Sequence, residues 1–447
     1  MSDIPTTPVP APTRWKAALA LTLYSSLMRA ALPALVVRAW SRGRVEPVYA
    51  QRWPERLGLG YPHAAEPLHA NRPLVWLHAV SLGETRACAP LVKALRAAMP
   101  GMRLLLTCTT ATGWTAGEAL LQEGDLHTWL PFDTPGAMRR FLKHHRPLVG
   151  VLMETEVWPN VQREAQRAGV PMVLANARLS DKSLRQGLRF APLLVPAARA
   201  MRLTLAQTEA DATRLRAMGA PDVRVSGNLK FDVQPPAHLV AQGRSWAVAA
   251  GRPVVLFASS REGEEAPALR AWVKQTAAMT VRPIFLVVPR HPQRFDEVAR
   301  LVTEAGLRLQ RRSTWTDTLP PEAAQADVWL GDSMGEMPLY YGAAPVCLLG
   351  GSFEPLGGQN LIEAVACGCH VVMGPSTFNF LEAAQLCELE GGATRVGGVD
   401  EAVTVALAKA TEHNPTQNDT RSAGWLKSHA GAADRMAARI AALTNQG

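Results

Sequence analysis

Short apolar runs alternate with amphipathic helical patterns along most of this chain. In LVWLHAVSLGETRACAPLVKALRAA, the apolar run at residues 74–79 predicts a buried strand, and Cys88, Leu91, Val92 and Leu95 recur behind it on one helical face. Alternation of this kind predicts a mainly parallel sheet with helices on its faces. The chain is therefore expected to be an α/β protein.

The alternation occurs in two blocks of similar length. The Pro-containing stretch FDVQPPAHLV between them predicts a linker. We expect two doubly wound, Rossmann-like domains that face each other, residues 46–231 and residues 232–447, with the last helix a candidate to pack back on the first domain. Strands are predicted at residues 74–79, 103–107, 148–153, 172–175 and 223–226, then at 253–258, 284–288, 328–330, 346–349 and 370–373.

The N-terminal stretch AALALTLYSSLMRAALPALVVRAW is apolar over about the length that a bilayer-spanning helix needs. Trp15 and Trp40 bracket it, as aromatic residues do at membrane interfaces. Arg29 at its centre and Pro33 one turn later favour a helix that lies in the interface over one that spans the membrane. Residues 1–45 are thus expected to form a membrane-associated segment, and the alternative is a buried helix of a soluble domain.

The net charge of the chain indicates which kinds of partner it can bind. Lys and Arg exceed Asp and Glu to give a net charge of +9 over 447 residues, which favours nucleic acid, an anionic membrane or phosphorylated substrates. The six cysteines form no CxxC pair, so we expect reduced core thiols rather than disulfides or zinc ligands. No D-x-D pair or His/Cys/carboxylate cluster predicts a metal ion.

In doubly wound sheets ligands bind at the carboxyl ends of the strands, so residues in strand-to-helix turns are the candidates for function. Glu84 is expected at a helix N-terminus, where the dipole keeps it ionised and able to accept a proton; its alternative role is only to complement that dipole. Glu154 and Glu156 follow a strand two residues apart, so an extended chain directs both to one side, unless they are incidental loop acids. Lys230 follows another strand, and alone it indicates only a solvated lysine.

Three turns of the second block suit a phosphorylated ligand. VPRHPQRF puts Arg290, His291 and Arg294 directly after a strand, where a guanidinium group can bind phosphate oxygens. GDSMGEM opens a helix, and the glycine pairs of GGSFEPLGGQNLIEA let backbone approach a ligand. Asn360 and Glu363 have the capping-box spacing N-x-x-E, so helix initiation is their alternative role. No turn is a Walker loop or a G-x-G-x-x-G motif, and a monophosphate leaving group needs only helix N-termini and one or two arginines.

Eight motifs occur in order along the chain: SLGETRA, METEVWPN, NARLSDKS, GNLKFD, VPRHPQRF, GDSMGEM, GGQNLIEA and MGPSTFNF. Over residues 15–440 this series resembles the bacterial 3-deoxy-D-manno-octulosonic acid (Kdo) transferases of lipopolysaccharide assembly. The resemblance implies the two-domain GT-B fold and an inverting, metal-independent transfer of Kdo from CMP-Kdo to a lipid A precursor (lipid IVA). It also implies no cofactor, no nucleic-acid partner, contact with membrane lipids, and a location at the cytoplasmic face of the bacterial inner membrane.

The resemblance assigns residues to this reaction. It implies that Glu84 is the proton acceptor and that Glu154 and Lys230 stabilise the transition state. Two positions depart from the family pattern, because Gln359 and Arg261 stand where members commonly have histidine. The expected CMP contacts are Pro289, Arg290, Met334, Gly335, Glu336, Asn360, Leu361, Ile362 and Glu363.

These assignments predict that an acceptor hydroxyl loses its proton to Glu84 while it attacks the anomeric carbon of Kdo, opposite the departing CMP. Glu154 is expected to act on the oxocarbenium-like transition state or to position Lys230, and Arg290 to stabilise the charge that grows on the phosphate. Two alternatives stay open. One is a soluble GT-B nucleotide-sugar 2-epimerase, against which the apolar N-terminal stretch argues; the other is a membrane-bound binding module that has lost catalysis.

Overall fold

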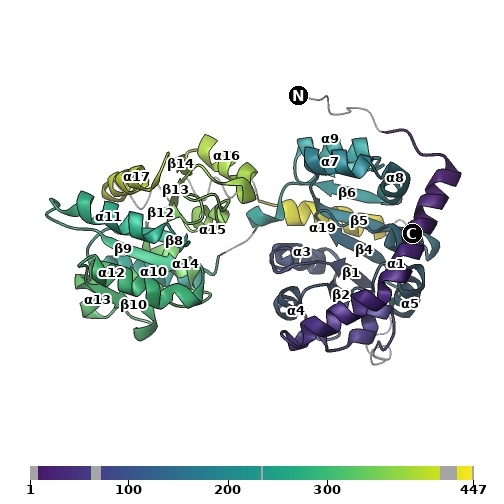
Figure 1. The fold of residues 1–447 in the computed structure, drawn as a ribbon, viewed down its shortest axis with the longest axis horizontal. Coiled ribbons are helices and arrows are strands. Elements are labelled where there is room, and N and C mark those ends of the chain that lie inside the picture. The colour runs from purple at the N-terminus through teal and green to yellow at the C-terminus, as the bar shows by residue number, and fades with distance from the viewer. Residues whose placement is uncertain (1–8, 62–71, 233–234, 413–429, 445–447) are drawn as a thin grey trace. The chain divides into compact units, whose positions relative to one another are not determined.

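The computed structural model describes residues 9–61, 72–232, 235–412 and 430–444, and Figure 1 labels its helices and strands. The chain forms two compact units: the first holds residues 1–232 and 429–447, and the second holds residues 233–428. This division falls one residue from the expected domain boundary. Residues 233 and 234 of the predicted linker lie outside the described residues.

The first unit is built on a seven-stranded sheet in the order β3-β2-β1-β4-β5-β6-β7. All its strand pairs are parallel, which confirms the predicted type of sheet. The strands are β1 (Leu74–His78), β2 (Arg103–Cys108), β3 (Leu126–Trp129), β4 (Val149–Met153), β5 (Met172–Ala177), β6 (Leu203–Ala206) and β7 (Val223–Val225). The helices are α1 (Arg14–Gly43), α2 (Leu82–Ala87), α3 (Ala89–Ala98), α4 (Ala111–Glu118), α5 (Pro135–His145), α6 (Pro159–Arg167), α7 (Asp181–Leu188), α8 (Ala191–Arg199), α9 (Glu209–Met218) and α19 (Ala432–Thr444), with the 3-10 helices η1 (Pro47–Tyr49), η2 (Trp53–Leu57) and η4 (Leu229–Asp232).

Side chains of β1 alternate between two hydrophobic cores. Val75 and Leu77 belong to the core that α3 and the C-terminal helix α19 cover, whereas Trp76 packs on Phe141 of α5 on the other face, with ring centroids 4.9 Å apart. The period of two follows from the pleat, and both faces are apolar because helices cover both. Burial on two faces explains why such strands appear in the sequence as continuous apolar runs.

The second unit contains a second parallel seven-stranded sheet, in the order β10-β11-β9-β8-β12-β13-β14. Its core includes Trp272 stacked on Phe285, with ring centroids 4.4 Å apart. The strands are β8 (Val254–Ser260), β9 (Ile284–Pro289), β10 (Leu309–Arg311), β11 (Val328–Leu330), β12 (Val346–Leu349), β13 (His370–Met373) and β14 (Ala393–Arg395). The helices are α10 (Ala237–Ala250), α11 (Glu265–Thr276), α12 (Phe295–Glu304), α13 (Pro321–Gln325), α14 (Met337–Ala343), α15 (Leu361–Ala366), α16 (Leu381–Leu389) and α17 (Val399–Thr411), with η5 (Pro292–Arg294), η6 (Arg312–Thr314) and η7 (Phe378–Phe380).

All ten predicted strands are present, with ends shifted by at most two residues. The sequence analysis does not predict β3, β6, β10 and β14, which are three or four residues long. Three of these four strands lie at the edges of the sheets. The segments LQR of β10 and ATR of β14 each contain a single apolar residue, so they give no apolar run that the sequence analysis could identify.

In each sheet the strand order reverses beside the first strand of the unit. The two directions meet between β1 and β4 in the first unit and between β8 and β12 in the second. Open α/β sheets bind ligands outside the carboxyl ends of the strands at such points. These two strand pairs therefore locate the candidate sites.

The N-terminal helix α1 runs along the first unit (Figure 1) and is continuous through Pro33. The Tyr24 hydroxyl donates a hydrogen bond to the Asp133 carboxylate, and the Ser25 hydroxyl donates to the side-chain oxygen of Asn160, both at 2.8 Å. Only 6% of its most apolar window is buried, so α1 is not the core helix of the alternative interpretation. Among the described residues it alone is long and apolar enough to cross a membrane. Its exposed large apolar side chains are Trp15, Leu19, Leu23, Leu27, Val37 and Trp40.

Candidate active site

Glu84 lies in the first turn of α2, directly after β1, as predicted. The helix is capped by Ser81, whose hydroxyl accepts a hydrogen bond from the Glu84 backbone nitrogen at 3.4 Å. The Glu84 carboxylate in turn accepts from the backbone nitrogen of Val80 at 2.9 Å and from the Ser81 hydroxyl at 3.2 Å. Ser81 and Glu84 thus form an S-x-x-E capping motif that the sequence analysis did not identify.

Burial raises the pKa of the Glu84 carboxyl above its usual range, and the negative charge of Glu154 raises it further. The sequence argument considered only the helix dipole, which lowers the pKa of an acid in the first turn. In the structure the loss of water around the carboxyl outweighs the hydrogen bonds from Val80 and Ser81. A carboxylate with a raised pKa is a stronger base, which suits proton abstraction near neutral pH.

Glu154 follows β4 and is buried. Its φ of 54° is in the left-handed region, so the expectation of an extended chain that directs Glu154 and Glu156 to one side is wrong. Glu154 instead turns back to the neighbouring strand: its backbone nitrogen donates to Ala175, and its carboxylate accepts from Nε of Arg178 at 2.7 Å. A residue held in this sparsely populated region is a common feature of functional sites.

Glu156 remains in the same turn, before Pro159 opens α6. Burial and the charge of Glu84 raise the pKa of Glu156 to about 7. Three carboxyl groups from the ends of β1 and β4 therefore act on one another electrostatically, with the Arg178 guanidinium as a counter-charge. Acids whose pKa values are raised by burial and by a neighbouring negative charge are typical of sites that move protons.

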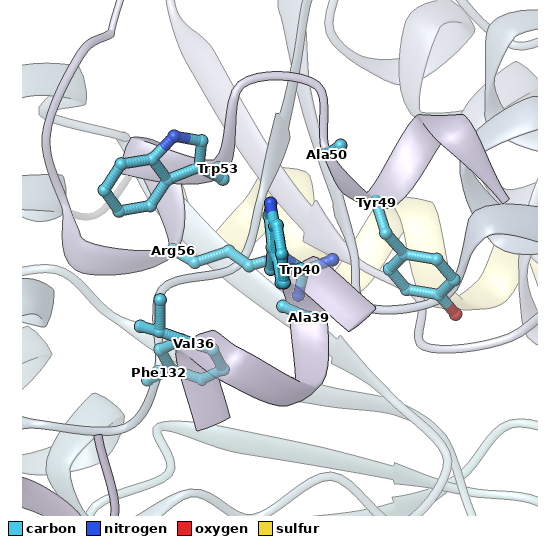
Figure 2. Close-up of a pocket in the computed structure, with 8 residues that line it drawn as sticks. All are labelled: Val36, Ala39, Trp40, Tyr49, Ala50, Trp53, Arg56 and Phe132. Atoms are coloured by element: carbon cyan, nitrogen blue, oxygen red, sulfur yellow. The ribbon is translucent and has the colours of Figure 1, made fainter. Parts of the chain in front are cut away.

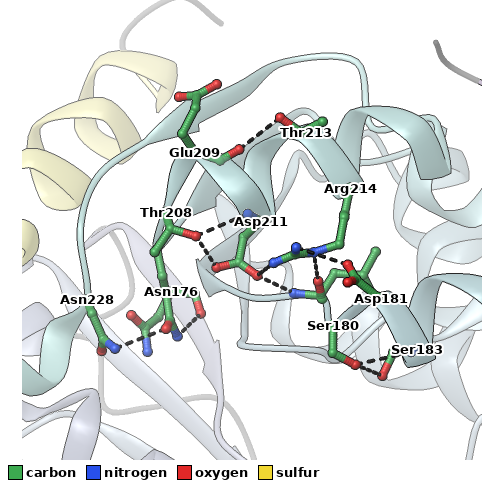
Figure 3. Close-up of polar contacts among 12 residues, drawn as sticks. Asn176, Ser180, Asp181, Ser183, Thr208, Glu209, Asp211, Thr213, Arg214 and Asn228 are labelled. Atoms are coloured by element: carbon green, nitrogen blue, oxygen red, sulfur yellow. Dashed lines mark hydrogen bonds and ion pairs between the residues drawn. The ribbon is translucent and has the colours of Figure 1, made fainter. Parts of the chain in front are cut away.

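Lys230 lies in η4, and hydrogen bonds attach the backbone around it to the ends of β5 and β6. Figure 3 shows two of the residues that take part, Asn176 and Asn228. The backbone nitrogen of Leu229 donates to the Asn176 side-chain oxygen at 3.0 Å, and the Lys230 nitrogen donates to the side chain of Asn228 at 3.0 Å. Gln207 joins the two asparagines, because it donates to the Asn176 carbonyl oxygen and accepts from the Asn228 amide. Lys230 itself is half-buried.

The loop that carries Arg178 is held from α9 (Figure 3). The Asp211 carboxylate accepts from the backbone nitrogen of Leu179 at 2.9 Å and from the Thr208 hydroxyl at 2.6 Å. Arg214 bridges Asp211 to Asp181 at the start of α7, at 3.1 Å from each. The motif NARLSDKS therefore forms a fixed support for the guanidinium that pairs with Glu154.

In the second unit, basic side chains gather at the ends of β8 and β9. The Arg290 side chain is exposed and donates to the Gln359 side-chain oxygen at 3.3 Å, and its backbone nitrogen donates to Ser260. The pKa of His291 is lowered by slight burial and by the positive charges of Arg261, Arg290 and Arg294. Gln359, which departs from the family pattern, thus accepts a hydrogen bond from a guanidinium group. Unlike a protonated histidine, it adds no positive charge.

Arg294 does not have the role that the sequence analysis considered for it. Its guanidinium group is buried and forms ion pairs with Glu265 at 2.6 Å and Glu297 at 3.0 Å. These two carboxylates accept hydrogen bonds from the guanidinium N–H groups that a phosphate would otherwise bind. Arg294 therefore stabilises the start of α12 and leaves Arg290 as the exposed guanidinium after β9.

The glycine-rich turn after β12 is organised by a buried acid, Glu264. Its carboxylate accepts from the backbone nitrogens of Gly351 at 2.8 Å, Phe353 at 3.1 Å and Arg261 at 2.8 Å. Gly351 has a φ of 70°, and its nitrogen is one of these donors. Glu264 thus joins the turn after β8 to the turn after β12, at the point where the strand order reverses.

The expected CMP contacts lie in three separate turns of the second unit. Pro289 ends β9 and is buried. Met334 and Gly335 are exposed in the turn before α14, and Glu336 there pairs with Arg312 at 2.8 Å. Asn360 caps α15, because its side chain accepts from the Ile362 nitrogen at 3.2 Å; Leu361 and Ile362 are buried, and Glu363 is half-buried. Capping was the alternative role for Asn360, and the structure shows that role.

Sequence reasoning missed Arg178 and Glu264 as parts of these sites. Arg178 follows β5 directly, so the rule that selected Glu84 and Glu154 could have selected it. Glu264 was harder to identify, because two of its three partners, Gly351 and Phe353, come from a turn that only the fold brings next to it. In the described part of the chain, no three His, Cys, Asp or Glu side chains form a group that could hold a metal ion.

Comparison with known proteins adds the family relationship. A family model described as 3-deoxy-D-manno-octulosonic-acid transferase (kdotransferase) matches residues 51–233. A 3-deoxy-D-manno-octulosonic acid transferase of Bordetella pertussis is 45% identical over 425 residues, which cover 92% of this chain and 97% of that protein. The transferase of Haemophilus influenzae is 31% identical over 421 residues, or 92% and 96% of the two chains. The structure of a glycosyltransferase from Rickettsia africae matches 84% of this chain and 100% of that chain with a TM-score of 0.56; at 12% identity it supports the fold alone.

Proposed function

The chain belongs to the 3-deoxy-D-manno-octulosonic acid (Kdo) transferase family of glycosyltransferases, and we propose that it moves Kdo from CMP-Kdo to a hydroxyl group of a lipid A precursor. The transfer inverts the anomeric carbon and needs no metal ion. The observation that carries this proposal is the group of acids at the ends of β1 and β4, in which burial raises the pKa of Glu84. This group of acids supplies a base for a hydroxyl nucleophile. A protein that only binds its ligands does not need such a base.

In the proposed reaction the acceptor hydroxyl attacks the anomeric carbon of Kdo from the side opposite CMP. The proton of the hydroxyl passes to the Glu84 carboxylate, the new C–O bond forms, and the bond to the CMP phosphate breaks with its electron pair leaving on the phosphate. General base catalysis of this kind contributes about 10²–10⁴-fold to a rate. The Glu154 carboxylate, fixed by Arg178, acts on the positive charge of the oxocarbenium-like transition state.

The second unit is proposed to bind the donor. Arg290 is exposed at the end of β9, close enough to His291 for its charge and that of Arg261 to lower the pKa of the imidazole, and these two guanidinium groups suit the phosphate of CMP. The Glu336 carboxylate is an acceptor only, so it suits ribose hydroxyls rather than phosphate oxygens. The same cationic groups can stabilise a monophosphate leaving group without a metal ion, and unchanged turnover in EDTA is the expected result.

Two apolar features favour a lipid-borne acceptor. A cavity of about 160 Å³ lies beside Arg178 and is lined mainly by apolar side chains, among them Leu174, Leu179, Leu194 and Met218. The exposed apolar face of α1, with tryptophans near both ends, suits a helix that lies in a membrane interface. Polar side chains in the middle of α1 form hydrogen bonds to the first unit, so the helix stays against that unit. We propose that α1 lies on the inner membrane at its cytoplasmic face.

The full chain, incubated with CMP-Kdo and a lipid A precursor, is expected to give products heavier by whole Kdo residues in mass spectrometry. Glu84→Ala should lower the rate of transfer by about 10²–10⁴-fold while CMP still raises the melting temperature of the variant. Transfer at a near-normal rate in Glu84→Ala contradicts the assignment of the base. Thermal protection by UDP but not by CMP, with no transfer, contradicts the donor and favours a nucleotide-sugar epimerase.

A further inference from the structure

The first unit contains a second cavity, of about 280 Å³, which the proposed reaction does not use. It lies between the C-terminal end of α1 and the segment that forms η1 and η2 (Figure 2). Aromatic and aliphatic side chains form most of its wall. They include Val36 and Trp40 of α1, Tyr49 of η1, Trp53 of η2 and Phe132.

One charged side chain, Arg56, also lines this cavity and is only 6% exposed. Its Nε and Nη2 are buried, and neither has a hydrogen-bond partner among the residues that the structure describes. The guanidinium group stacks on the Trp129 ring, 3.9 Å from its centroid. Stacking leaves the donors in the plane of the group unused, and a buried charge without hydrogen bonds is costly.

The neighbouring acid does not supply the missing partner. The Glu55 carboxylate accepts from the Thr128 hydroxyl at 2.7 Å and from the Trp129 nitrogen at 3.1 Å, and it pairs with Arg52. Burial lowers the pKa of Arg56 to about 10, so the group is still a cation at neutral pH. An anionic ligand is therefore the partner that the site lacks.

Two further arginines lie beside aromatic side chains that line this cavity. The Arg42 guanidinium lies 5.6 Å from the Tyr49 ring centroid, and that of Arg44 lies 4.1 Å from the Trp40 ring centroid. Trp40 is 58% exposed and Trp53 is 48% exposed, although both line the cavity. Tryptophan with one polar edge is enriched at the head-group level of a bilayer, where lipid phosphates lie.

We propose that this cavity binds the phosphate head group of one anionic phospholipid of the membrane, with the phosphate against Arg56 and the start of an acyl chain along Val36, Trp40 and Phe132. The inference rests on the membrane association proposed above. The fit is specific: a free phosphate would leave the apolar side chains of the cavity without a partner, and a zwitterionic lipid would bring its own cation to the arginines. The bound lipid joins the end of α1 to η2 and fixes the depth of the first unit in the bilayer.

Native mass spectrometry of the full chain, released from neutral detergent containing dihexanoyl phosphatidylglycerol or dihexanoyl phosphatidylcholine, tests the proposal. One phosphatidylglycerol is expected to remain bound, at least about tenfold more than phosphatidylcholine, because a hydrogen-bonded charge pair is worth this much. Arg56→Gln should lose this retention. Arg38→Gln, which removes an exposed arginine of the same helix outside the cavity, should keep it.

A second variant covers the case in which Arg56→Gln does not fold. Ala39→Phe keeps the cation and fills the cavity from α1, so it should also lose retention of phosphatidylglycerol. Equal retention of the two lipids, retention in Ala39→Phe, displacement by millimolar inorganic phosphate, or retention of a lipid A precursor alone overturns the proposal. The assay contains no CMP-Kdo, so its outcome is independent of Kdo transfer; loss of transfer with intact lipid retention counts only against the proposed function.

Discussion

At the residue scale, Glu84 contributes to the start of a helix in a way that is compatible with its proposed role as a base. Its backbone nitrogen is capped by Ser81 and its carboxylate accepts from the preceding backbone, so it helps to begin α2. The same hydrogen bonds fix the carboxylate in a half-buried position, where the charge of Glu154 is close enough to act on its pKa. The residues that start the helix therefore also orient the proposed base.

The pH dependence of transfer follows from the raised pKa of Glu84. A base must be ionised, and a carboxyl group with a raised pKa becomes ionised only at a higher pH than an ordinary one. We expect kcat/KM to rise with pH on an acidic limb displaced above the usual glutamate range, and Glu84→Gln to remove this limb. The measurement is a pH–rate profile with CMP-Kdo, and a limb that persists in Glu84→Gln contradicts the prediction.

Arg178 should set the position of that acidic limb. Its positive charge lowers the pKa of Glu84 and it pairs with Glu154, so Arg178→Gln should raise the pKa of the base and move the limb to higher pH. The rate at high pH should fall less than the rate at neutral pH. Arg185→Gln, an exposed change on α7, is the matched control, and equal profiles for the two variants would show that Arg178 does not act on the base.

At the element scale, α1 is held by polar contacts rather than by a large apolar interface. Asp133 accepts from Tyr24 and also from the backbone nitrogens of Asn160 and Val161 at 3.1 and 2.9 Å. Burial raises the pKa of Asp133 to about 6, although these bonds lower it. One carboxylate thus joins α1 to the start of α6, and the apolar side chains of α1 are left for the membrane.

Tyr24→Phe should weaken this attachment by about 1–2 kcal/mol at pH 7.5, because a hydrogen bond to a charged acceptor is lost. The effect should shrink as pH falls below the Asp133 pKa of about 6, since a protonated carboxyl accepts a weaker hydrogen bond. Hydrogen exchange of α1 amides at the two pH values measures the change. Ser26→Ala, on the exposed side of the helix, should leave exchange unchanged, and a loss in Tyr24→Phe that is equal at both pH values would exclude Asp133 as the pH-sensitive partner.

At the scale of the whole molecule, the proposed reaction divides between two units with separate cores. The first unit supplies the base and closes its core with the C-terminal helix α19, in which Met436 and Ile440 are buried. The second unit supplies the positive cluster at the ends of β8 and β9. Variants in the two units should therefore affect different kinetic constants.

Arg290→Gln should raise the KM for CMP-Kdo about tenfold or more, because the exposed guanidinium is proposed to bind the CMP phosphate. The KM for the acceptor should change little, and Glu84→Gln should instead lower kcat with little effect on CMP binding. Arg300→Gln, on the outer side of α12, is the control for loss of one positive charge. A KM for CMP-Kdo that is unchanged in Arg290→Gln removes this residue from the donor site.

The sequence by itself determined the class of fold and most of its strands. Continuous apolar runs such as residues 149–153 identify strands buried on both faces, and the alternation with helices fixes a parallel sheet. Position in a strand-to-helix turn was also enough to select Glu84, Glu154 and Arg290, because in parallel sheets all such turns lie at one edge. These features depend on neighbours in the chain, so the chain alone reveals them.

Only the tertiary structure decided how the selected residues interact. It placed Glu154 at a positive φ beside Arg178, paired Arg294 with buried Glu265 and exposed Glu297, and joined two turns through Glu264. It also left Nε and Nη2 of Arg56 buried without a hydrogen-bond partner among the described residues. Burial, pairing and pKa shifts depend on atoms far apart in the sequence, and no local pattern can encode which distant atoms replace the water around a charge.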